Sequence, residues 1–152
     1  MSLPEVSVVI PVRNGSKYND DIYITGNIAD SFLGLCVLKK KKNFNKFNIF
    51  FKKKYYEPDL QMRFYKYLRM VASSSIDVSD GLCQDLNHLC LNSKCGALID
   101  LNLLPLSLEC KTLIKRKKIR LKNIFSKGDD YQILFTSNKK NRLKISNLSK
   151  NT

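Results

Sequence analysis

A strand gives way to a helix at Ile76-Asp77-Val78-Ser79-Asp80-Gly81-Leu82. Ile76 and Val78 favour a short strand over 73–78, and Asp80-Gly81 is a turn signal that ends it. Leu82, Leu86 and Leu89 then follow at helical spacing, which predicts a helix to about Leu91. The sequence therefore predicts a strand–turn–helix unit with polar side chains at the turn.

The polar groups of this turn suit the binding of a metal ion or a phosphate. Strand alternation points Asp77 and Ser79 to one side, and the turn can bring Asp80 toward the same opening. Carboxylates at that spacing suit magnesium, which binds protein carboxylates together with substrate phosphates. The amino terminus of the helix adds N–H groups for an anion. The alternative is an ordinary helix cap, which needs only one of these side chains.

Strands and helices alternate along the rest of the chain. The patterns predict further strands over 6–12, 22–25, 97–101 and 131–136, and helices over 28–38, over 58–71 and, behind a Ser107 cap, up to residue 115. The segment 43–56 is aromatic and lysine-rich, and a loop or a frayed helix is expected there. This alternation predicts a layered α/β or α+β domain. The residues expected on the buried face of helix 28–38 are Phe32, Leu35, Cys36 and Leu38.

The chain of 152 residues is long enough for one ordinary domain. We expect that domain to span 1–137, and we expect the polar, lysine-rich segment 138–152 to be a loose tail. An apolar fraction of 43% supports a packed core. No apolar run approaches the ~20 residues of a membrane span, so no membrane partner is expected. No basic region followed by an apolar stretch opens the chain, so no signal peptide is expected either.

The cysteine pattern indicates the compartment. Five cysteines are present without a C-x-x-C pair, and His88 is the only histidine. Structural zinc needs closely paired soft ligands, so no zinc site is expected. An odd number of cysteines argues against a disulfide framework. Reduced thiols of this kind are typical of a cytoplasmic protein.

The net charge of +14 has two interpretations. Strongly basic chains attract nucleic acid, anionic membranes and phosphorylated ligands. However, the charge comes mainly from lysine and is accompanied by many asparagine, isoleucine and phenylalanine residues, which is the mixture that an AT-rich genome encodes. Charge alone therefore does not establish a nucleic-acid-binding function.

Two further segments carry groups that could bind a ligand. The first is Lys127-Gly128-Asp129-Asp130-Tyr131, where two acids could face a cation or a polar substrate. The second is Val12-Arg13-Asn14-Gly15-Ser16, where the N–H groups of the Arg13 guanidinium could bind a phosphate. Taken alone, the first segment is better explained as an ordinary Gly-Asp turn, and Arg13 in the second as a solvated hairpin residue.

Together, and in this order, the three segments resemble those of thiamine-monophosphate kinases. The arginine turn at 13–16 is followed by Asp20-Asp21-Ile22-Tyr23-Ile24-Thr25-Gly26, which is similar to the family's aspartate pair and threonine-glycine strand end. The box over 76–82, with Asp85 and His88 after it, resembles the family's central motif. The third segment leads into Leu134-Phe135-Thr136, as in the family. The resemblance extends from about Val6 to Thr136.

The resemblance implies a fold and an activity. The fold is the carboxyl-terminal-type domain of the aminoimidazole ribonucleotide synthetase-like superfamily, with a mixed sheet packed against helices. The activity is the transfer of the γ-phosphoryl group of ATP to thiamine monophosphate, giving thiamine diphosphate. Arg13 and Ser79 would contact ATP, Asp77 and Asp80 would bind Mg²⁺, and Asp129 would contact the thiamine-phosphate substrate. No side chain is assigned a catalytic role.

The family's amino-terminal domain precedes the region to which this chain corresponds. We therefore expect a truncated or split thiamine-monophosphate kinase that is inactive alone. If the enzyme is split, a separate chain is the partner that supplies the amino-terminal domain. A homodimer is compatible with the resemblance, and nucleic acid is not expected as a partner. Two alternatives stay open. One is a basic nucleic-acid-binding module on a degenerate kinase scaffold, and the other is a related superfamily enzyme with a different phosphorylated substrate.

Overall fold

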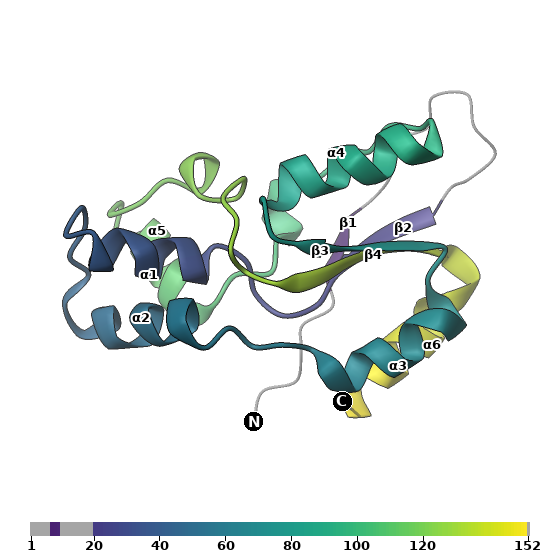
Figure 1. Cartoon of the computed structure of the whole chain (residues 1–152), viewed down its shortest axis with the longest axis horizontal. Helices are drawn as coiled ribbons and strands as arrows, with labels where there is room; N and C mark the ends of the chain where they lie inside the picture. Colours follow the sequence, from purple (N-terminus) through teal and green to yellow (C-terminus); the bar gives the residue numbers. More distant parts are fainter. Residues whose placement is uncertain (1–6, 10–19, 152) are drawn as a thin grey trace.

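A four-stranded sheet forms the centre of the molecule (Figure 1). The computed structural model describes residues 7–9 and 20–151. The strands are β1 (Ser7–Val9), β2 (Asp20–Ile24), β3 (Ser74–Val78) and β4 (Gln132–Asn138), and they lie in the order β1-β2-β4-β3. Every strand pairing in this described part is antiparallel, namely β1 with β2, β2 with β4 and β3 with β4. The predicted layered class is confirmed, but in these residues the sheet is antiparallel rather than mixed.

Helices cover both faces of the sheet and extend it at one end. Their bounds are α1 (Asp30–Leu38), α2 (Asn48–Tyr56), α3 (Met62–Val71), α4 (Leu82–Ser93), α5 (Leu108–Lys115) and α6 (Arg142–Asn151). Short 3₁₀ turns occupy Asn45–Phe47, Leu101–Leu103, Leu121–Asn123 and Lys139–Asn141. No helix among residues 20–151 combines the length and the apolarity needed to cross a membrane.

Side chains that alternate along the strands belong to two separate hydrophobic cores, one on each face of the sheet. Ile24 and Leu134 point to the face covered by α4, where they join Leu82. Tyr23 and Phe135, which are register partners, stack on the opposite face with ring centroids 5.1 Å apart. That second core is closed by α3 and α6, which lie below the sheet in Figure 1. The sheet is therefore the middle layer of a three-layer arrangement.

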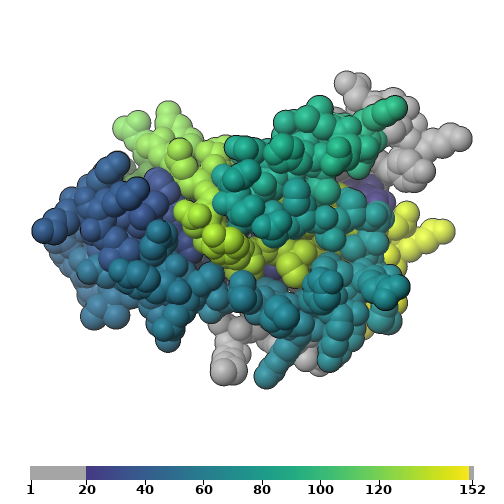
Figure 2. Space-filling view, viewed as in Figure 1, coloured from purple at the N-terminus to yellow at the C-terminus, as the bar shows by residue number. Residues whose placement is uncertain are grey.

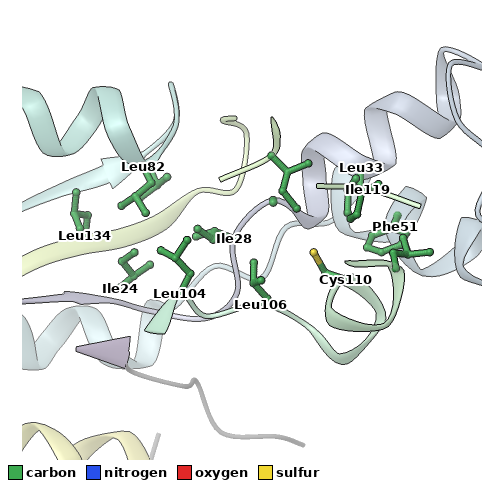
Figure 3. Close-up of a cluster of buried hydrophobic side chains, with 14 of the residues drawn as sticks. Ile24, Ile28, Leu33, Phe51, Leu82, Leu104, Leu106, Cys110, Ile119 and Leu134 are labelled. Atoms are coloured by element: carbon green, nitrogen blue, oxygen red, sulfur yellow. The ribbon is translucent and has the colours of Figure 1, made fainter. Parts of the chain in front are cut away.

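The first core continues beyond the sheet into α1, α2 and α5 (Figure 3). Ile28 and Leu106 join the sheet residues to Leu33, Phe51 and Cys110, which come from the three helices. Helix α1 lies close against α2, and a side chain on Gly34 would place its Cβ 2.1 Å from the carbonyl oxygen of Phe51.

This close contact corrects the expected buried face of α1. The predicted residues Phe32, Leu35, Cys36 and Leu38 are only partly buried. The helix instead buries Asp30, Ser31, Leu33, Gly34 and Val37. Polar Asp30 and Ser31 can face inward because each has a hydrogen-bond partner from elsewhere in the chain: Ser107 for Asp30, and the carbonyl of Lys54 for Ser31.

Two other expectations differ from the structure. The segment 97–101 forms no strand, and it ends in a 3₁₀ turn whose cap is Asp100. The segment expected to be a loose tail contains α6, whose Ile145 is 1% exposed in the second core. The guanidinium of Arg142, also on α6, pairs with the buried carboxylate of Asp21. Apolar residues in the tail thus find a partner surface on α3 that local sequence does not reveal.

Candidate functional site

The turn after β3 lies directly against the loop before β4. Pairing of the two strands continues past their ends, since the Tyr131 amide donates to the Val78 carbonyl at 2.9 Å. One step further, the Asp129 amide donates to the Ser79 carbonyl, also at 2.9 Å. Two of the three segments singled out in the sequence are thereby brought together. The third, which contains Arg13, lies outside the described residues.

Glycines make this close approach feasible. A Cβ on Gly128 would lie 2.1 Å from the Ser79 carbonyl oxygen, and one on Gly81 would lie 2.4 Å from the carbonyl oxygen of Ser126. Gly81 also has φ +123°, a backbone conformation that side chains disfavour. The turn and the loop are therefore in backbone-to-backbone contact, which fixes the positions of the polar side chains they carry.

The backbone of the loop is itself strained. Asp129 has φ 68° and Tyr131 has φ 52°, both in the left-handed region. Aspartate tolerates this region, but a bulky residue such as tyrosine rarely enters it. Such conformations cost on the order of 1–3 kcal/mol and concentrate at ligand-binding sites. The strain therefore supports a ligand-binding role for the loop.

Asp77 and Asp80 are both exposed at this turn, and Ser79 between them is half-buried. Asp80 accepts one hydrogen bond, from the Gln84 amide at 3.2 Å. The Asp77 carboxylate has no hydrogen bond or ion pair within the part of the chain that the structure describes. No lysine or arginine among those residues pairs with either carboxylate. Two uncompensated negative charges thus face solvent at one turn.

Neither carboxylate caps the helix that follows. The N-cap position of α4 is Gly81, and no side chain there accepts a capping hydrogen bond. Instead Asp85, which is 2% exposed, reaches back and accepts from the Gly81 amide at 3.0 Å. The helix-cap alternative for Asp77, Ser79 or Asp80 is therefore not supported, and Asp85 makes the side-chain contact at the start of α4 instead.

The donor set fits magnesium only in part. No group of three or more histidine, cysteine, aspartate or glutamate side chains comes together as a metal site within 20–151. Magnesium, however, is commonly held by one or two carboxylates, with substrate phosphates and water completing its octahedron. Asp77 and Asp80 meet that lower requirement.

The two acids of the loop before β4 separate in the structure. Asp129 is partly exposed, whereas Asp130 is 3% exposed and points inward. The Asp130 carboxylate accepts from the Ala29 amide at 2.6 Å and from the Ser31 amide at 3.3 Å, at the start of α1. Burial raises the pKa of Asp130 to about 7, although these two bonds oppose the shift. Asp130 therefore ties the loop to α1.

A second buried acid lies beside it and was not anticipated from the sequence. Asp30 is 3% exposed and accepts a 2.7 Å hydrogen bond from the Ser107 hydroxyl, while its other oxygen has no partner. Burial raises the pKa of Asp30 to about 7 as well. Both acids line a cavity of about 20 Å³, which is space for about one water molecule. The sequence carries two weak signals of this pair of buried acids. One is the Gly-Asp pattern before β4, and the other is an acid in the first turn of α1.

Comparison with known proteins places this geometry in context. No family model matches the chain. The thiamine-monophosphate kinase of Buchnera aphidicola subsp. Schizaphis graminum is 41% identical over 138 residues, which is 88% of this chain and 42% of that protein. The thiamine-monophosphate kinase of Escherichia coli (strain K12) is 37% identical over 132 residues, which is 86% of this chain and 40% of that protein.

Solved structures agree with the sequence comparison. Thiamine-monophosphate kinase from Stenotrophomonas maltophilia matches with a TM-score of 0.77 at 25% identity, over 93% of this chain and 45% of that one. AaThiL complexed with AMPPCP and TMP matches with a TM-score of 0.69 at 28% identity, over 84% of this chain and 42% of that one. These matches confirm the predicted fold of the aminoimidazole ribonucleotide synthetase-like superfamily. The chain is thus homologous to thiamine-monophosphate kinases over about two fifths of their length, as expected for a carboxyl-terminal part.

Proposed function

We propose that this chain forms part of a thiamine-monophosphate kinase, in which the γ-phosphoryl group of ATP passes to thiamine monophosphate. The observation that carries the proposal is the contact between the turn over 79–81 and the loop over 126–130. It places the exposed Asp80 next to the loop that carries Asp129, and the exposed Asp77 lies near the end of β3, the strand that leads into this turn. A charge-rich, solvent-facing turn of this kind suits a reaction in which positioning and charge neutralisation do most of the work.

Each side chain has a distinct role in this proposal. Asp77 and Asp80 would hold Mg²⁺, which neutralises the charge of the phosphates during transfer. The Ser79 hydroxyl would contact ATP, and Asp129 would contact the thiamine-phosphate substrate. Arg13, outside the described residues, would contact ATP. The complex of AaThiL with AMPPCP and TMP supports a nucleotide as a ligand of this fold.

The chain spans about two fifths of its relatives' length. We propose that activity requires the amino-terminal part of such a kinase, in a longer chain or as a separate partner. Two carboxylates alone leave most of the coordination of Mg²⁺ to water and phosphate. Weak nucleotide binding by these residues in isolation is the expected consequence.

A chimaera tests the proposal directly. The matching part of the Escherichia coli relative is replaced by this chain, and formation of thiamine diphosphate and Mg²⁺-dependent ATP affinity are both measured. Asp77→Asn and Asp80→Asn should each abolish product formation and weaken Mg²⁺-dependent binding at least tenfold. Glu57→Gln, which removes an exposed acid after α2, should change neither. Retention of full activity by both aspartate variants would refute the assignment.

A further inference from the structure

The positive charge of the chain is concentrated in two segments. Residues 39–54 contain eight lysines and no acid, and residues 111–122 contain seven lysines and arginines and no acid. Together they hold more than half of the 27 basic residues. The intervening segment 57–110 is the reverse, with four basic and seven acidic residues. An AT-rich genome would spread lysine over the whole chain, so composition bias does not explain this clustering.

The fold brings the two basic segments to one end of the molecule. Helices α1, α2 and α5 lie together there, at the left of Figure 1, and residues of α1 and α2 form the left end of the surface in Figure 2. Between the segments lies a cavity of about 380 Å³. Its lining residues are Asn43, Phe44, Asn45, Lys46, Phe47, Leu113, Arg116 and Lys118.

Helix ends account for only a small part of this charge. Lysines follow the last turns of α1 and α5, where the Lys41 and Lys118 amides donate to Cys36 and Leu113 carbonyls. Cations favour such helix ends, but each end carries only about −0.5 charge. The two ends and the cavity between them carry nine basic residues, over 39–46 and 115–118. Interactions with helix ends therefore leave most of this positive charge unexplained.

The cations at the cavity have no acidic neighbours. Lys46, Arg116 and Lys118 are exposed, and no carboxylate within residues 20–151 pairs with any of them. The Asn45 side chain, beside them, makes no hydrogen bond in the same part of the chain. The Phe47 ring is half-buried at the cavity, with the Lys46 ammonium 5.4 Å from its centroid. Exposed cations, an amide and an aromatic ring therefore share one concave surface.

We propose that this basic end binds single-stranded nucleic acid. A single phosphate would neutralise at most two of the nine charges, whereas a strand places phosphates along both segments. A flexible single strand can also insert one nucleotide into the cavity, where Phe47 offers a stacking surface and Asn45 a hydrogen-bonding group. The surface consists of residues other than Asp77, Ser79, Asp80 and Asp129, so this binding goes beyond the proposed kinase function and does not depend on it.

Fluorescence anisotropy with labelled 20-mer oligonucleotides tests the proposal on the complete chain. Affinities for single-stranded RNA and for single-stranded DNA are each measured over a salt series, and their comparison shows whether the 2′-hydroxyl contributes to binding. In the triple variant Lys46→Gln, Arg116→Gln and Lys118→Gln, the slope of log K against log salt should fall by about 2, since each lost phosphate contact removes ~0.7. The matched control Lys66→Gln, Lys140→Gln and Lys150→Gln has the same net charge but changes exposed lysines outside the basic end, and its slope should stay unchanged.

Three results would overturn the proposal. The first is an absence of binding at low salt, and the second is equal loss of affinity in both triple variants, which would indicate diffuse attraction. The third is tighter binding to duplex DNA or to phosphatidylserine vesicles than to the single strand. Thermal melts of both variants establish that each remains folded. A reduced slope of log K against log salt then reflects the loss of surface contacts and not unfolding.

Discussion

The Asp129 amide donates a 2.9 Å hydrogen bond to the Ser79 carbonyl oxygen, and this bond joins two segments that are about 50 residues apart in the chain. Beyond it the backbones nearly touch, because Gly128 has no side chain to separate them. Replacement of residues at this contact should therefore affect stability and ligand geometry together.

Gly128→Ala should destabilise the protein. The added Cβ would lie 2.1 Å from the Ser79 carbonyl oxygen and 2.7 Å from the Asp80 carbonyl carbon, so the backbone must move. We expect the free energy of unfolding to fall by about 1–3 kcal/mol, as in other overpacked sites. Gly96→Ala is the control, because its Cβ would meet nothing within 4 Å. Equal effects in urea denaturation would show that the close contact does not exist in solution.

Asp77→Asn and Asp80→Asn should leave stability within about 0.5 kcal/mol, or raise it slightly, because neither carboxylate caps α4 or pairs with a cation in the described residues. Asp85→Ala should behave differently. It removes the acceptor of the buried Gly81 amide, which costs about 1–3 kcal/mol. Urea denaturation of the three variants separates the two kinds of acid, and substantial loss from Asp77→Asn or Asp80→Asn would contradict our assignment.

Stability should depend on pH through Asp30. Burial raises its pKa from the usual 3.8 to about 7, so between these pH values the folded state holds more protons than the unfolded state. Its contribution to the free energy of unfolding therefore falls as pH rises through that window and stays low above it. Asp30→Asn removes this titration, and its stability relative to wild type should increase from pH 4 to pH 8. Denaturation at several pH values measures the difference, and a constant difference would argue against a buried, titrating Asp30.

Arg142→Gln should destabilise the protein at neutral pH. Its guanidinium donates to both oxygens of Asp21, which is fully buried, and the hydrogen bond lowers the pKa of that carboxyl. A lowered pKa stabilises the fold above about pH 4, and the effect is lost as pH falls through the folded-state value. The melting temperature should therefore drop more at pH 7 than at pH 3. Arg63→Gln, an exposed arginine on α3, should show no such pH-dependent loss.

Local sequence predicted those elements whose signals are local. The box over 76–82 gave a strand, a turn and a helix at the expected places, and Ser107 caps α5 by accepting from the Cys110 amide. The contact between the two carboxyl-bearing segments was not predicted, because the order of motifs along a chain does not determine which segments pair. The separate roles of Asp129 and Asp130 were not predicted either, since adjacent acids look alike until one is buried against α1.

The remaining differences arise from partners distant in sequence. The alternation over 97–101 satisfies a strand pattern, but no neighbouring strand pairs with it within 20–151. The inward face of α1 depends on the close approach of α2 at Gly34, and α6 depends on apolar residues of α3. None of these partners lies within the short stretch of sequence from which hydrophobic periodicity is judged.

The strand order has a consequence for synthesis of the protein. Among the described strands β4 is synthesised last, yet it lies between β2 and β3 and pairs with both. Until residues 132–138 emerge from the ribosome, β3 has no partner strand among the described residues, and the aromatic core around Phe135 cannot assemble. Pairing of β2 with β4 also closes a loop of more than 100 residues, a slow step that exposes the nascent chain to proteases and chaperones. A premature stop anywhere before β4 would therefore yield a chain that cannot form this sheet.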